Sequence, residues 1–190
     1  MSFPTEHADR LSPIVGSRHG RWSRGIDELR GRLTERSKPM ADLVMRRAMA
    51  ADVPTIVALL ADDELGAKRE SLDDIQPYLA AFATIDADPH QLLVAAELGG
   101  EIVGTMQLTF IRGLSHRGAT RAQIEAVRIA AELRGQGHGS TLIAWAIEEA
   151  RRRNCYLVQL TSNNSRLDAH RFYTRLGFTQ SHAGFKLQLH

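Results

Sequence analysis

The chain has 190 residues, of which 43% are hydrophobic and 24% charged, enough for one well-packed domain and too few for two large ones. It contains no apolar run of about 18 residues and no apolar segment behind its N-terminal charges, so the sequence predicts neither a membrane partner nor a secretory signal, and we expect a cytoplasmic protein. The single cysteine, Cys155, excludes an intramolecular disulfide framework and a cluster of metal-binding thiolates.

The net charge of +2 is unevenly distributed along the chain. Residues 1–40 contain eight Lys or Arg and five Asp or Glu, a balance of +3, which leaves −1 for the remainder. A nucleic-acid-binding domain typically carries a basic stripe on its folded part, so this distribution argues against a nucleic-acid partner. We interpret residues 1–42 as a mobile basic extension and residues 43–190 as the folded domain, with translation from Met40 or Met45 as the alternative.

The first half of the folded part has alternating strand and helix patterns. A strand is predicted at 43–47, followed by a helix that Asp52 caps. A second helical region ends near Ile85, with Pro77 placed to start or kink its second half. Two β-rich segments at 91–97 and 101–111 flank Leu98-Gly99-Gly100, which is typical of a tight hairpin.

The second half continues with a polar loop and a strand at 120–129, in which a period of two places Glu125, Val127 and Ile129 on one face. A glycine-rich turn and a helix follow. Further elements are predicted in this order: a strand at 156–161, a helix at 168–176 that Gly177 ends, and closing strands at 178–181 and 185–189. The order predicts an α/β fold with a mixed sheet of about seven strands and about four helices.

The stretch Arg134-Gly135-Gln136-Gly137-His138-Gly139 is the most informative motif. Glycines at alternating positions let successive backbone N–H groups converge at the positive end of the following helix, which favours a phosphorylated ligand. A merely tight turn is the alternative for such a cluster taken alone. A P-loop needs a lysine before Ser140, and a dinucleotide fingerprint needs a glycine at Ser140 or Leu142, so the turn fits neither class.

Two segments together resemble the GNAT superfamily of acyl-CoA-dependent N-acetyltransferases. Arg134-x-x-Gly137-x-Gly139 is similar to the family's coenzyme A motif, and residues 169–178, which include Tyr173, are similar to its later helix. The resemblance covers residues 43–190 and implies the GNAT fold, with the fourth and fifth strands of the mixed sheet splayed apart. One departure is Arg166, where an asparagine is common in the family; Asn163 and Asn164 lie slightly earlier.

The resemblance implies an acetyl-CoA site along these segments. The amides of the glycine turn would hold the pyrophosphate of coenzyme A, and the pantetheine arm would lie between the splayed strands. The N–H of Ile129 would bind the thioester carbonyl and stabilise the developing oxyanion. The residues expected to bind the cofactor are Ile129, Ala131, Arg134, Gly135, Gln136, Gly137, His138, Gly139, Ser140 and Asn164.

Direct attack by an amine needs proton transfer but no cysteine nucleophile, so we expect Cys155 to be a packed residue. Deprotonating a lysine-type amine of pKa near 10.4 at pH 7 adds about 4–5 kcal/mol to the barrier unless a base assists. Glu125 matches the place of the catalytic glutamate in some members of the family. A pairing with Arg121 or Arg128, with a water chain as base, is the alternative. Tyr173 is expected to protonate the leaving thiolate, and simple packing is its alternative.

The histidines have no metal-ligand spacing, and we expect no metal. The His138 side chain is expected to point outward from the glycine turn. His170 is expected on a helix, and His116 and His182 in loops, all of them solvated rather than catalytic.

The acceptor is indicated only by an acidic connection. In this family the segment between the first two helices borders the acceptor pocket, and here it contains Asp62, Asp63, Glu64 and Glu70. We therefore expect a cationic acceptor, the primary amine of a small molecule or amino acid, with a solvated acidic loop as the alternative. Acetylation of a protein lysine or N-terminus and a CoA-binding regulatory module without turnover stay open, and the resemblance is compatible with a homodimer.

Overall fold

The computed structural model describes residues 42–62 and 66–189, and its centre is a mixed five-stranded sheet in the order β1-β2-β3-β4-β5. Neighbouring strands are antiparallel except for the parallel pair of β4 and β5. The strands are β1 (Val44–Arg47), β2 (Gln91–Leu98), β3 (Glu101–Arg112), β4 (Thr120–Ile129) and β5 (Cys155–Leu160). Residues 1–41 of the predicted extension lie outside the described residues, as do Asp63 and Glu64.

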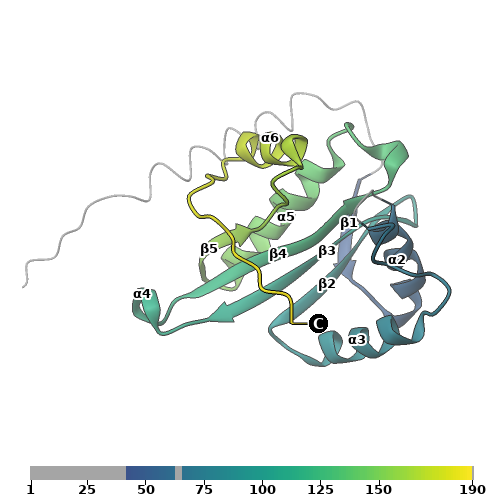
Figure 1. Cartoon of the computed structure of the whole chain (residues 1–190), viewed down its shortest axis with the longest axis horizontal. Helices are drawn as coiled ribbons and strands as arrows, with labels where there is room; N and C mark the ends of the chain where they lie inside the picture. Colours follow the sequence, from purple (N-terminus) through teal and green to yellow (C-terminus); the bar gives the residue numbers. More distant parts are fainter. Residues whose placement is uncertain (1–41, 63–65, 190) are drawn as a thin grey trace, which may run out of the picture. The chain divides into compact units, whose positions relative to one another are not determined.

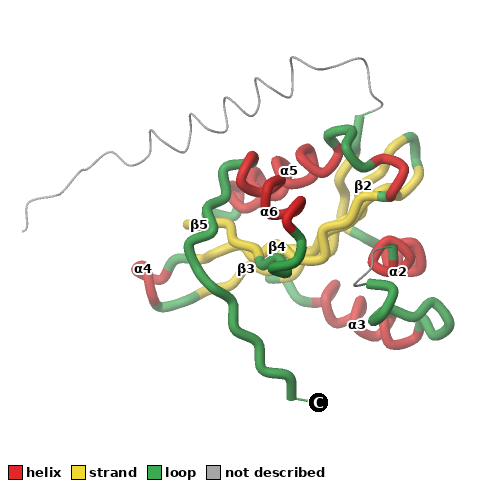
Figure 2. Tube along the Cα trace, turned by 45° about the horizontal axis from the view of Figure 1, so that its top comes forward, coloured by secondary structure: helices red, strands yellow, loops and turns green. Residues whose placement is uncertain are grey.

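Seven helical segments accompany the sheet within the described residues. They are η1 (Ala50–Asp52), α2 (Val53–Ala61), α3 (Gln76–Ala87), α4 (Ser115–Gly118), η2 (Ala131–Leu133), α5 (His138–Arg152) and α6 (Leu167–Arg175), where η denotes a 3-10 helix. Helices α5 and α6 lie on one face of the sheet, and α2 and α3 lie on the other (Figures 1 and 2). The sheet is therefore covered on both faces, which is the α/β architecture that the sequence predicts.

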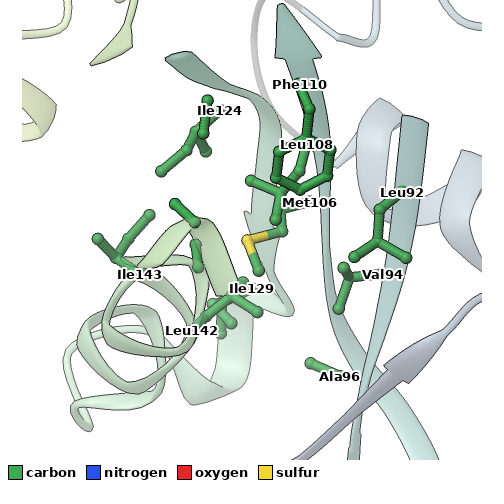
Figure 3. Packing of buried hydrophobic residues seen from close by; sticks show 13 residues of the cluster. Leu92, Val94, Ala96, Met106, Leu108, Phe110, Ile124, Ile129, Leu142 and Ile143 are labelled. Carbon is green, nitrogen blue, oxygen red and sulfur yellow. The ribbon is translucent and has the colours of Figure 1, made fainter. Parts of the chain in front are cut away.

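The main core lies between the sheet and α5 (Figure 3). Alternate residues of β3, Met106 and Leu108, are fully buried, and Leu142 and Ile143 of α5 pack over them. The helical spacing that the sequence contains places Ala146 on the same buried face of α5. This layer fixes α5, and with it the glycine turn at its N-terminus, against the sheet.

A second, smaller core lies between α2, α3 and the other face of the sheet. Its members include Ile56, Val57 and Phe82. Beside it, the Asp52 carboxylate accepts hydrogen bonds from Arg46 at 2.6 and 3.0 Å and from the Met49 N–H at 2.7 Å. Asp52 thus ends η1 and begins α2, which agrees with the predicted helix start.

The predicted closing strands at 178–181 and 185–189 are wrong, because the described chain has five strands and these segments are irregular. Phe178 is held by the turn that follows α6, since its N–H donates to the Tyr173 carbonyl at 3.1 Å. Alternation of apolar residues at 185–189 satisfies the sequence pattern of a strand, but a strand also requires a neighbour that completes its hydrogen bonds.

The helix predictions also need correction. The described residues contain five α-helices, one of them a single turn, rather than about four. The second helical region begins only at Gln76, since Pro77 lies in the first turn of α3 and lacks the N–H that an earlier helix would need. The predicted polar loop contains the short α4, where His116 and Arg117 adopt left-handed φ values of 52° and 60°.

Within residues 42–62 and 66–189, none of the helices combines the length and the apolar character needed to traverse a lipid bilayer.

Candidate active site

Strand β4 extends beyond the part of it that pairs with β5. The parallel ladder runs from Thr120 opposite Cys155 to Ile124 opposite Leu160 and ends there. Residues 125–129 of β4 remain paired with β3. The last five residues of β4 therefore have no β5 partner on their outer side, and the chain that follows β5 leaves the edge of β4 there. This agrees with the separation beside the fourth strand that the sequence resemblance implies.

Ile129 presents its backbone to this gap. The N–H of the next residue, Ala130, donates to the Val103 carbonyl oxygen of β3 at 2.8 Å. Because successive N–H groups of a strand point to opposite sides, the N–H of Ile129 points away from β3. Its carbonyl oxygen points the same way and accepts a hydrogen bond from Arg134 Nε at 2.9 Å. An unused donor is thus aimed at the space beyond the β4–β5 ladder.

The glycine turn forms an open cradle at the start of α5. Gly135 and Gly137 have φ values of 79° and 95°, and no atom lies within 4 Å of the position that a Cβ would take on either. The first backbone hydrogen bond of α5 runs from the Thr141 N–H to the Gly137 carbonyl at 3.1 Å. The preceding amides have no helical acceptor and lie at the positive end of the helix dipole, where an anionic oxygen is stabilised.

Arg134 ties this turn to two other elements. Its Nη2 donates to the carbonyl and carboxylate oxygens of Asp62 at 2.8 and 2.7 Å, while Nε holds the Ile129 carbonyl. Both ionic side chains are 47% exposed, so the pair adds at most about 1 kcal/mol to stability. What the contacts provide is geometry, because they fix the end of β4 and the end of α2 relative to the glycine turn.

The expectation that His138 points outward is wrong. His138 is 2% exposed, and its Nδ1 has no hydrogen-bond partner within the described chain. It is the first residue of α5, and helical side chains lean towards the N-terminus over the face that the helix buries.

Three further predicted residues lie in or next to the turn. Ala131 begins η2, Gln136 Nε2 donates to the Glu132 carbonyl at 2.9 Å, and Ser140 is half-buried in α5.

Glu125 and Ile129 lie on opposite faces of β4, which contradicts the predicted alternation. Glu125 is opposite Gln107 and Ile129 is opposite Gly104, two β3 residues of different parity. The register shifts between these pairs, next to Ala126, whose φ is 53°. Such a β-bulge adds one residue to the strand and reverses the faces of all residues that follow it. Glu125 therefore faces the α2 and α3 layer.

The Glu125 carboxylate is exposed and makes no hydrogen bond or ion pair with another described residue. The predicted alternative, a pairing of Glu125 with Arg121 or Arg128, is therefore not seen within the described residues.

A cavity of about 170 Å³ lies on the same face of the sheet as Glu125. Gln107, the cross-strand neighbour of Glu125, and Ala126 both line it. The other lining residues are Val53, Ile56, Val57, Leu60, Tyr78, Ala81, Phe82, Ile85, Leu93 and Thr105. No ionisable acid or base other than the Tyr78 phenol is among them, so the cavity accepts uncharged groups.

Tyr173 lies on α6 and packs against the main core. Its ring contacts Phe172 and Phe178, with centroids 5.1 and 5.8 Å away. Burial raises the pKa of Tyr173 above its usual value, while the positive charges of Arg166 and Arg128 act in the opposite direction. The phenol is therefore protonated at neutral pH and can act as a proton donor.

The loop between β5 and α6 contains the predicted asparagines. The Asn163 side chain accepts hydrogen bonds from the Ser165 N–H and hydroxyl at 2.9 and 2.8 Å, and its carbonyl contacts His170 Nε2 at 2.9 Å. Asn163 therefore shapes the start of α6. Asn164 is exposed in the same loop, and Arg166 is the N-cap residue of α6.

The other side chains that could react, one cysteine and two histidines, have contacts that indicate structural roles. Cys155 is half-buried at the start of β5, and burial raises the pKa of its thiol, which disfavours the nucleophilic thiolate. His116 stacks on Tyr156 with ring centroids 4.9 Å apart, and His182 contacts Ser181. In the part of the chain that the structure describes, no three His, Cys, Asp or Glu side chains are grouped as metal ligands would be.

Two features of the site were missed by the sequence reasoning. Gly104 allows the close approach of β4, because a Cβ on it would lie 2.7 Å from Ile129 Cδ1 and 2.9 Å from the Arg128 carbonyl oxygen. A lone glycine within a strand pattern is the signal that could have identified it. The bulge at Ala126 had no such signal, since alanine is not typical of a positive φ.

Comparisons with known proteins support the family resemblance that the sequence motifs indicate. Residues 54–178 match the acetyltransferase (GNAT) family. An aminoalkylphosphonate N-acetyltransferase from Salmonella typhimurium is 35% identical over 144 residues, which make up 74% of this chain and 88% of that protein.

Two solved structures share the fold at substantial identity. A protein from Bacillus halodurans described as a transcriptional regulator is 45% identical, with a TM-score of 0.75, covering 78% of this chain and 100% of that one. An Agrobacterium tumefaciens protein whose acetyltransferase assignment is provisional is 30% identical, with a TM-score of 0.69 and coverages of 76% and 99%. The family match spans well over half of the chain, and the match to the Salmonella N-acetyltransferase covers most of that protein's length. With its parted strands and glycine cradle, the chain belongs to the GNAT acetyltransferase family and is an acyl-CoA-dependent N-acetyltransferase.

Proposed function

We propose that this protein transfers the acetyl group of acetyl-CoA directly to the primary amine of a small molecule, with Glu125 as base and Tyr173 as acid. The observation that carries the proposal is the gap between β4 and β5, which has three groups around it. The Ile129 N–H is aimed into it, the glycine cradle lies beyond the end of β4, and the partly buried Tyr173 side chain is supplied by α6.

The residues around the gap fit coenzyme A chemically. The open space over Gly135 and Gly137 and the unengaged amides at the start of α5 suit a pyrophosphate. The other predicted ligands of the turn would contribute backbone amides, while Arg134 holds the turn in place through Ile129 and Asp62. When bound, acetyl-CoA supplies an activated thioester, and the chain supplies the groups that orient it and move protons.

At the thioester carbonyl, the Ile129 N–H would stabilise the negative charge that develops on oxygen as the amine attacks. A single preorganised donor of this kind contributes roughly 2.7–4 kcal/mol of transition-state stabilisation. The donor is well fixed, because Ile129 is 9% exposed in the main core and its carbonyl is held by Arg134.

The amine would approach from the α2 and α3 face. Glu125 lies on this face beside the cavity and has no competing partner among the described residues, so its carboxylate is available to accept the ammonium proton, directly or through one water. Tyr173 approaches from the α6 side, and its phenol would donate a proton to the departing thiolate. The two proton transfers then occur on opposite sides of the reacting carbonyl.

The acceptor class follows from the cavity and from the Salmonella relative. An aminoalkylphosphonate combines a primary amine with an alkyl chain, and its amine and alkyl part suit Glu125 and the uncharged cavity. The acidic connection gives weaker support for a cationic acceptor. Asp62 is occupied by Arg134, and Glu70 accepts a hydrogen bond from the Tyr78 hydroxyl at 3.2 Å.

The test is thiol release from acetyl-CoA by the purified full-length protein with a panel of aminoalkylphosphonates, amino acids, polyamines and lysine peptides. We expect release with small primary amines, first with aminoalkylphosphonates, and acetylation of the amine nitrogen by mass spectrometry. Turnover only with peptides would instead support acetylation of a protein lysine or N-terminus.

A second candidate is a CoA-binding regulatory module without turnover, which the description of the Bacillus halodurans relative as a transcriptional regulator favours. Binding of acetyl-CoA by calorimetry without thiol release with any amine of the panel would support this candidate and overturn acetyl transfer. The Gly137→Val variant serves as the control for specific binding in both cases.

A further inference from the structure

The sheet face that carries Glu125 extends beyond α2 and α3. Figures 1 and 2 both show these two helices beside one end of β3 and β4, while α4 lies at the other end. On the opposite face, under α5, Ala122 and Ile124 of β4 are fully buried. The β4 residues that alternate with them are half-buried or exposed. The part of the Glu125 face nearest α4 is therefore accessible to a small ligand.

This part of the face carries a row of amide side chains. The residues that lie opposite one another across four strands are Gln91, Thr109, Gln123 and Gln159. Gln91 Oε1 accepts hydrogen bonds from Thr109 Oγ1 at 2.9 Å and from Gln107 Nε2 at 3.0 Å. Gln123 Oε1 accepts one from Gln159 Nε2 at 2.7 Å. The oxygens of Gln91 and Gln123 are thus engaged, while their Nε2 groups make no hydrogen bond within the described residues and can donate to a ligand.

Strand β4 adds a positive and a negative charge to this row. Arg121, Gln123 and Glu125 alternate along the strand before the bulge, and their β3 partners alternate in step, so all three side chains lie on one face. Like Glu125, Arg121 has no ion pair or hydrogen bond within the described residues. Four residues of strand separate their Cα atoms by roughly 14 Å, too far for the two side chains to pair. Arg121 Nη1 lies near Gly113, at the end of the row away from Glu125.

We infer that this strip of β4, with the amide row around it, selects acceptors that carry an anionic group as well as the amine. The acceptor is then a primary amine joined by an alkyl chain to a phosphonate or carboxylate. The inference rests on the proposed function, which places the amine at Glu125. The cavity on the other side of Glu125 has no cationic lining residue, so it suits the alkyl part and not the anion.

The chemistry of the strip fits a small anion. The Nε2 groups of Gln91 and Gln123 are donors without an acceptor, and Arg121 supplies a positive charge beyond them. Hydrogen bonds from amides and guanidinium groups to an ionised oxygen are stronger than those between neutral groups. A half-buried surface also screens such contacts less than bulk solvent does. An uncharged amine would gain nothing from these groups, so they favour the anionic acceptor.

The spacing sets the length of the acceptor. Glu125 and Gln123 are separated by two residues of strand, roughly 7 Å. An extended chain of about three to five methylene groups spans this distance between an amine and an anion. An α-amino acid holds both groups on one carbon and is too short to reach both side chains.

The experiment compares acceptors that differ only in the anion. Thiol release from acetyl-CoA by the full-length protein is followed with aminoalkylphosphonates, amino carboxylates and plain alkylamines, each with about one to six methylene groups. We expect the highest kcat/KM for acids with about three to five methylenes. These should exceed the alkylamine of equal length by roughly 10- to 100-fold, the effect of a hydrogen bond to a charged group. The phosphonate and carboxylate series show which anion the strip prefers.

Variants of Arg121 test whether the strip causes this preference. Arg121→Gln should lower the ratio of kcat/KM for the acid to that for the alkylamine by roughly 10-fold, mainly through KM for the acid. Arg121→Glu should shift the preference from acids to diamines of equal length, which a merely structural role would not produce. Arg112→Gln is the matched control, because it removes a guanidinium from the same hairpin but from the alternate face of β3, and it should keep the native ratio. Melting temperature and acetyl-CoA affinity by calorimetry show that each variant is folded.

The outcomes separate this inference from the function on which it rests. Equal kcat/KM for acids and alkylamines of the same length would overturn the inference and leave acetyl transfer intact. A native ratio in Arg121→Gln, or an equal loss in Arg112→Gln, would overturn it too. Thiol release with none of the amines, although acetyl-CoA binds, would overturn the proposed function and this inference with it.

Discussion

Tyr173 packs edge-on against Phe178, with ring centroids 5.8 Å apart and an interplanar angle of 71°. The contact is made by the turn after α6, where Gly177 has a φ of 92° and the Phe178 N–H donates to the Tyr173 carbonyl at 3.1 Å. The position of the Tyr173 ring is therefore set by aromatic packing and a backbone turn. These contacts are made by the ring and not by the hydroxyl, so the two can be tested separately.

Tyr173→Phe should keep the fold and lose the proton donor. We expect kcat to fall by roughly 10²–10⁴-fold, the range for a single general acid, with little change in acetyl-CoA affinity. Raising the pH should not restore the rate. Burial raises the pKa of Tyr173, so in the native enzyme the hydroxyl stays protonated into the alkaline range. The exposed Tyr156 on β5 is the control, and Tyr156→Phe should have native kinetics. A native kcat for Tyr173→Phe would leave Tyr173 as a packing residue only.

Glu125→Gln should lower activity in a way that depends on pH, because alkali can compensate for the loss of a base. At neutral pH kcat/KM should fall by roughly 10²-fold or more, and it should recover partly as the pH approaches the pKa of the acceptor amine. Thiol-release kinetics from about pH 6 to 10 measure both effects. Glu101→Gln, at the exposed start of β3, is the control and should follow the native profile. Native activity of Glu125→Gln across this range would indicate a water chain as the base.

Gly137→Val should abolish acetyl-CoA binding, because the side chain would occupy the cradle over the glycine turn. Gly100 in the β2–β3 hairpin is a close match in conformation, with a φ of 90° against 95° for Gly137, and neither has an atom within 4 Å of a Cβ. Gly100→Val therefore carries similar backbone strain at a remote place. Calorimetry should show binding by Gly100→Val and none by Gly137→Val. Equal affinity in the two folded variants would remove the cofactor from this turn.

Gly104→Ala tests the placement of the Ile129 donor without altering any group that contacts substrate. The added Cβ would lie 2.9 Å from the Arg128 carbonyl oxygen, a backbone atom, so β4 has to shift. Since a misplacement of about 1 Å can cost about 10²-fold in rate, we expect a loss of roughly 10-fold in kcat. A Cβ at Gly113, just after β3, would make only ordinary contacts at 3.7 Å, so Gly113→Ala should leave kcat nearly unchanged. Native turnover in Gly104→Ala, with the shift confirmed by crystallography, would argue against Ile129 as the oxyanion donor.

The parts of the fold that depend on local pattern could be predicted from the sequence. The glycine turn before α5 and the hairpin at Gly99 and Gly100 are determined by backbone freedom at single positions, and both are found where predicted. Strands β1 to β5 and helices α5 and α6 follow from apolar periodicity within one or two residues.

What could not be predicted depends on contacts between segments distant in the chain. The bulge at Ala126 reverses the face of Glu125 relative to Ile129, although both positions fit one unbroken period of two. Arg134 matches a motif that suggests a ligand, yet its guanidinium is occupied by Asp62, 72 residues away. His138 appeared solvated because a polar residue in a glycine-rich turn usually is, and only the packing of α5 on the sheet shows it to be buried.

The pH dependence of stability should report the buried carboxylate of Asp52. The Asp52 side chain is 7% exposed, and its hydrogen bonds with Arg46 lower its pKa below the usual value, against the opposing effect of burial. A carboxyl whose pKa is lower in the folded state contributes stability above its unfolded pKa of about 3.9 and loses it as the pH falls through the folded value. The contribution is therefore complete at neutral pH and decreases below about pH 4.

Asp52→Asn should lower the free energy of unfolding at pH 7 by about 1–3 kcal/mol, the cost of leaving a buried hydrogen-bonding group poorly satisfied. The difference from the native protein should shrink as the pH falls below about 4, because the native carboxyl is then protonated too. Urea unfolding at a series of pH values measures this. Asp86→Asn removes the exposed pair with Arg47, whose side chains are 42% and 48% exposed, and should cost at most about 1 kcal/mol. A difference between native and Asp52→Asn that stays constant down to about pH 2 would show that the ionised carboxylate is not what stabilises the start of α2.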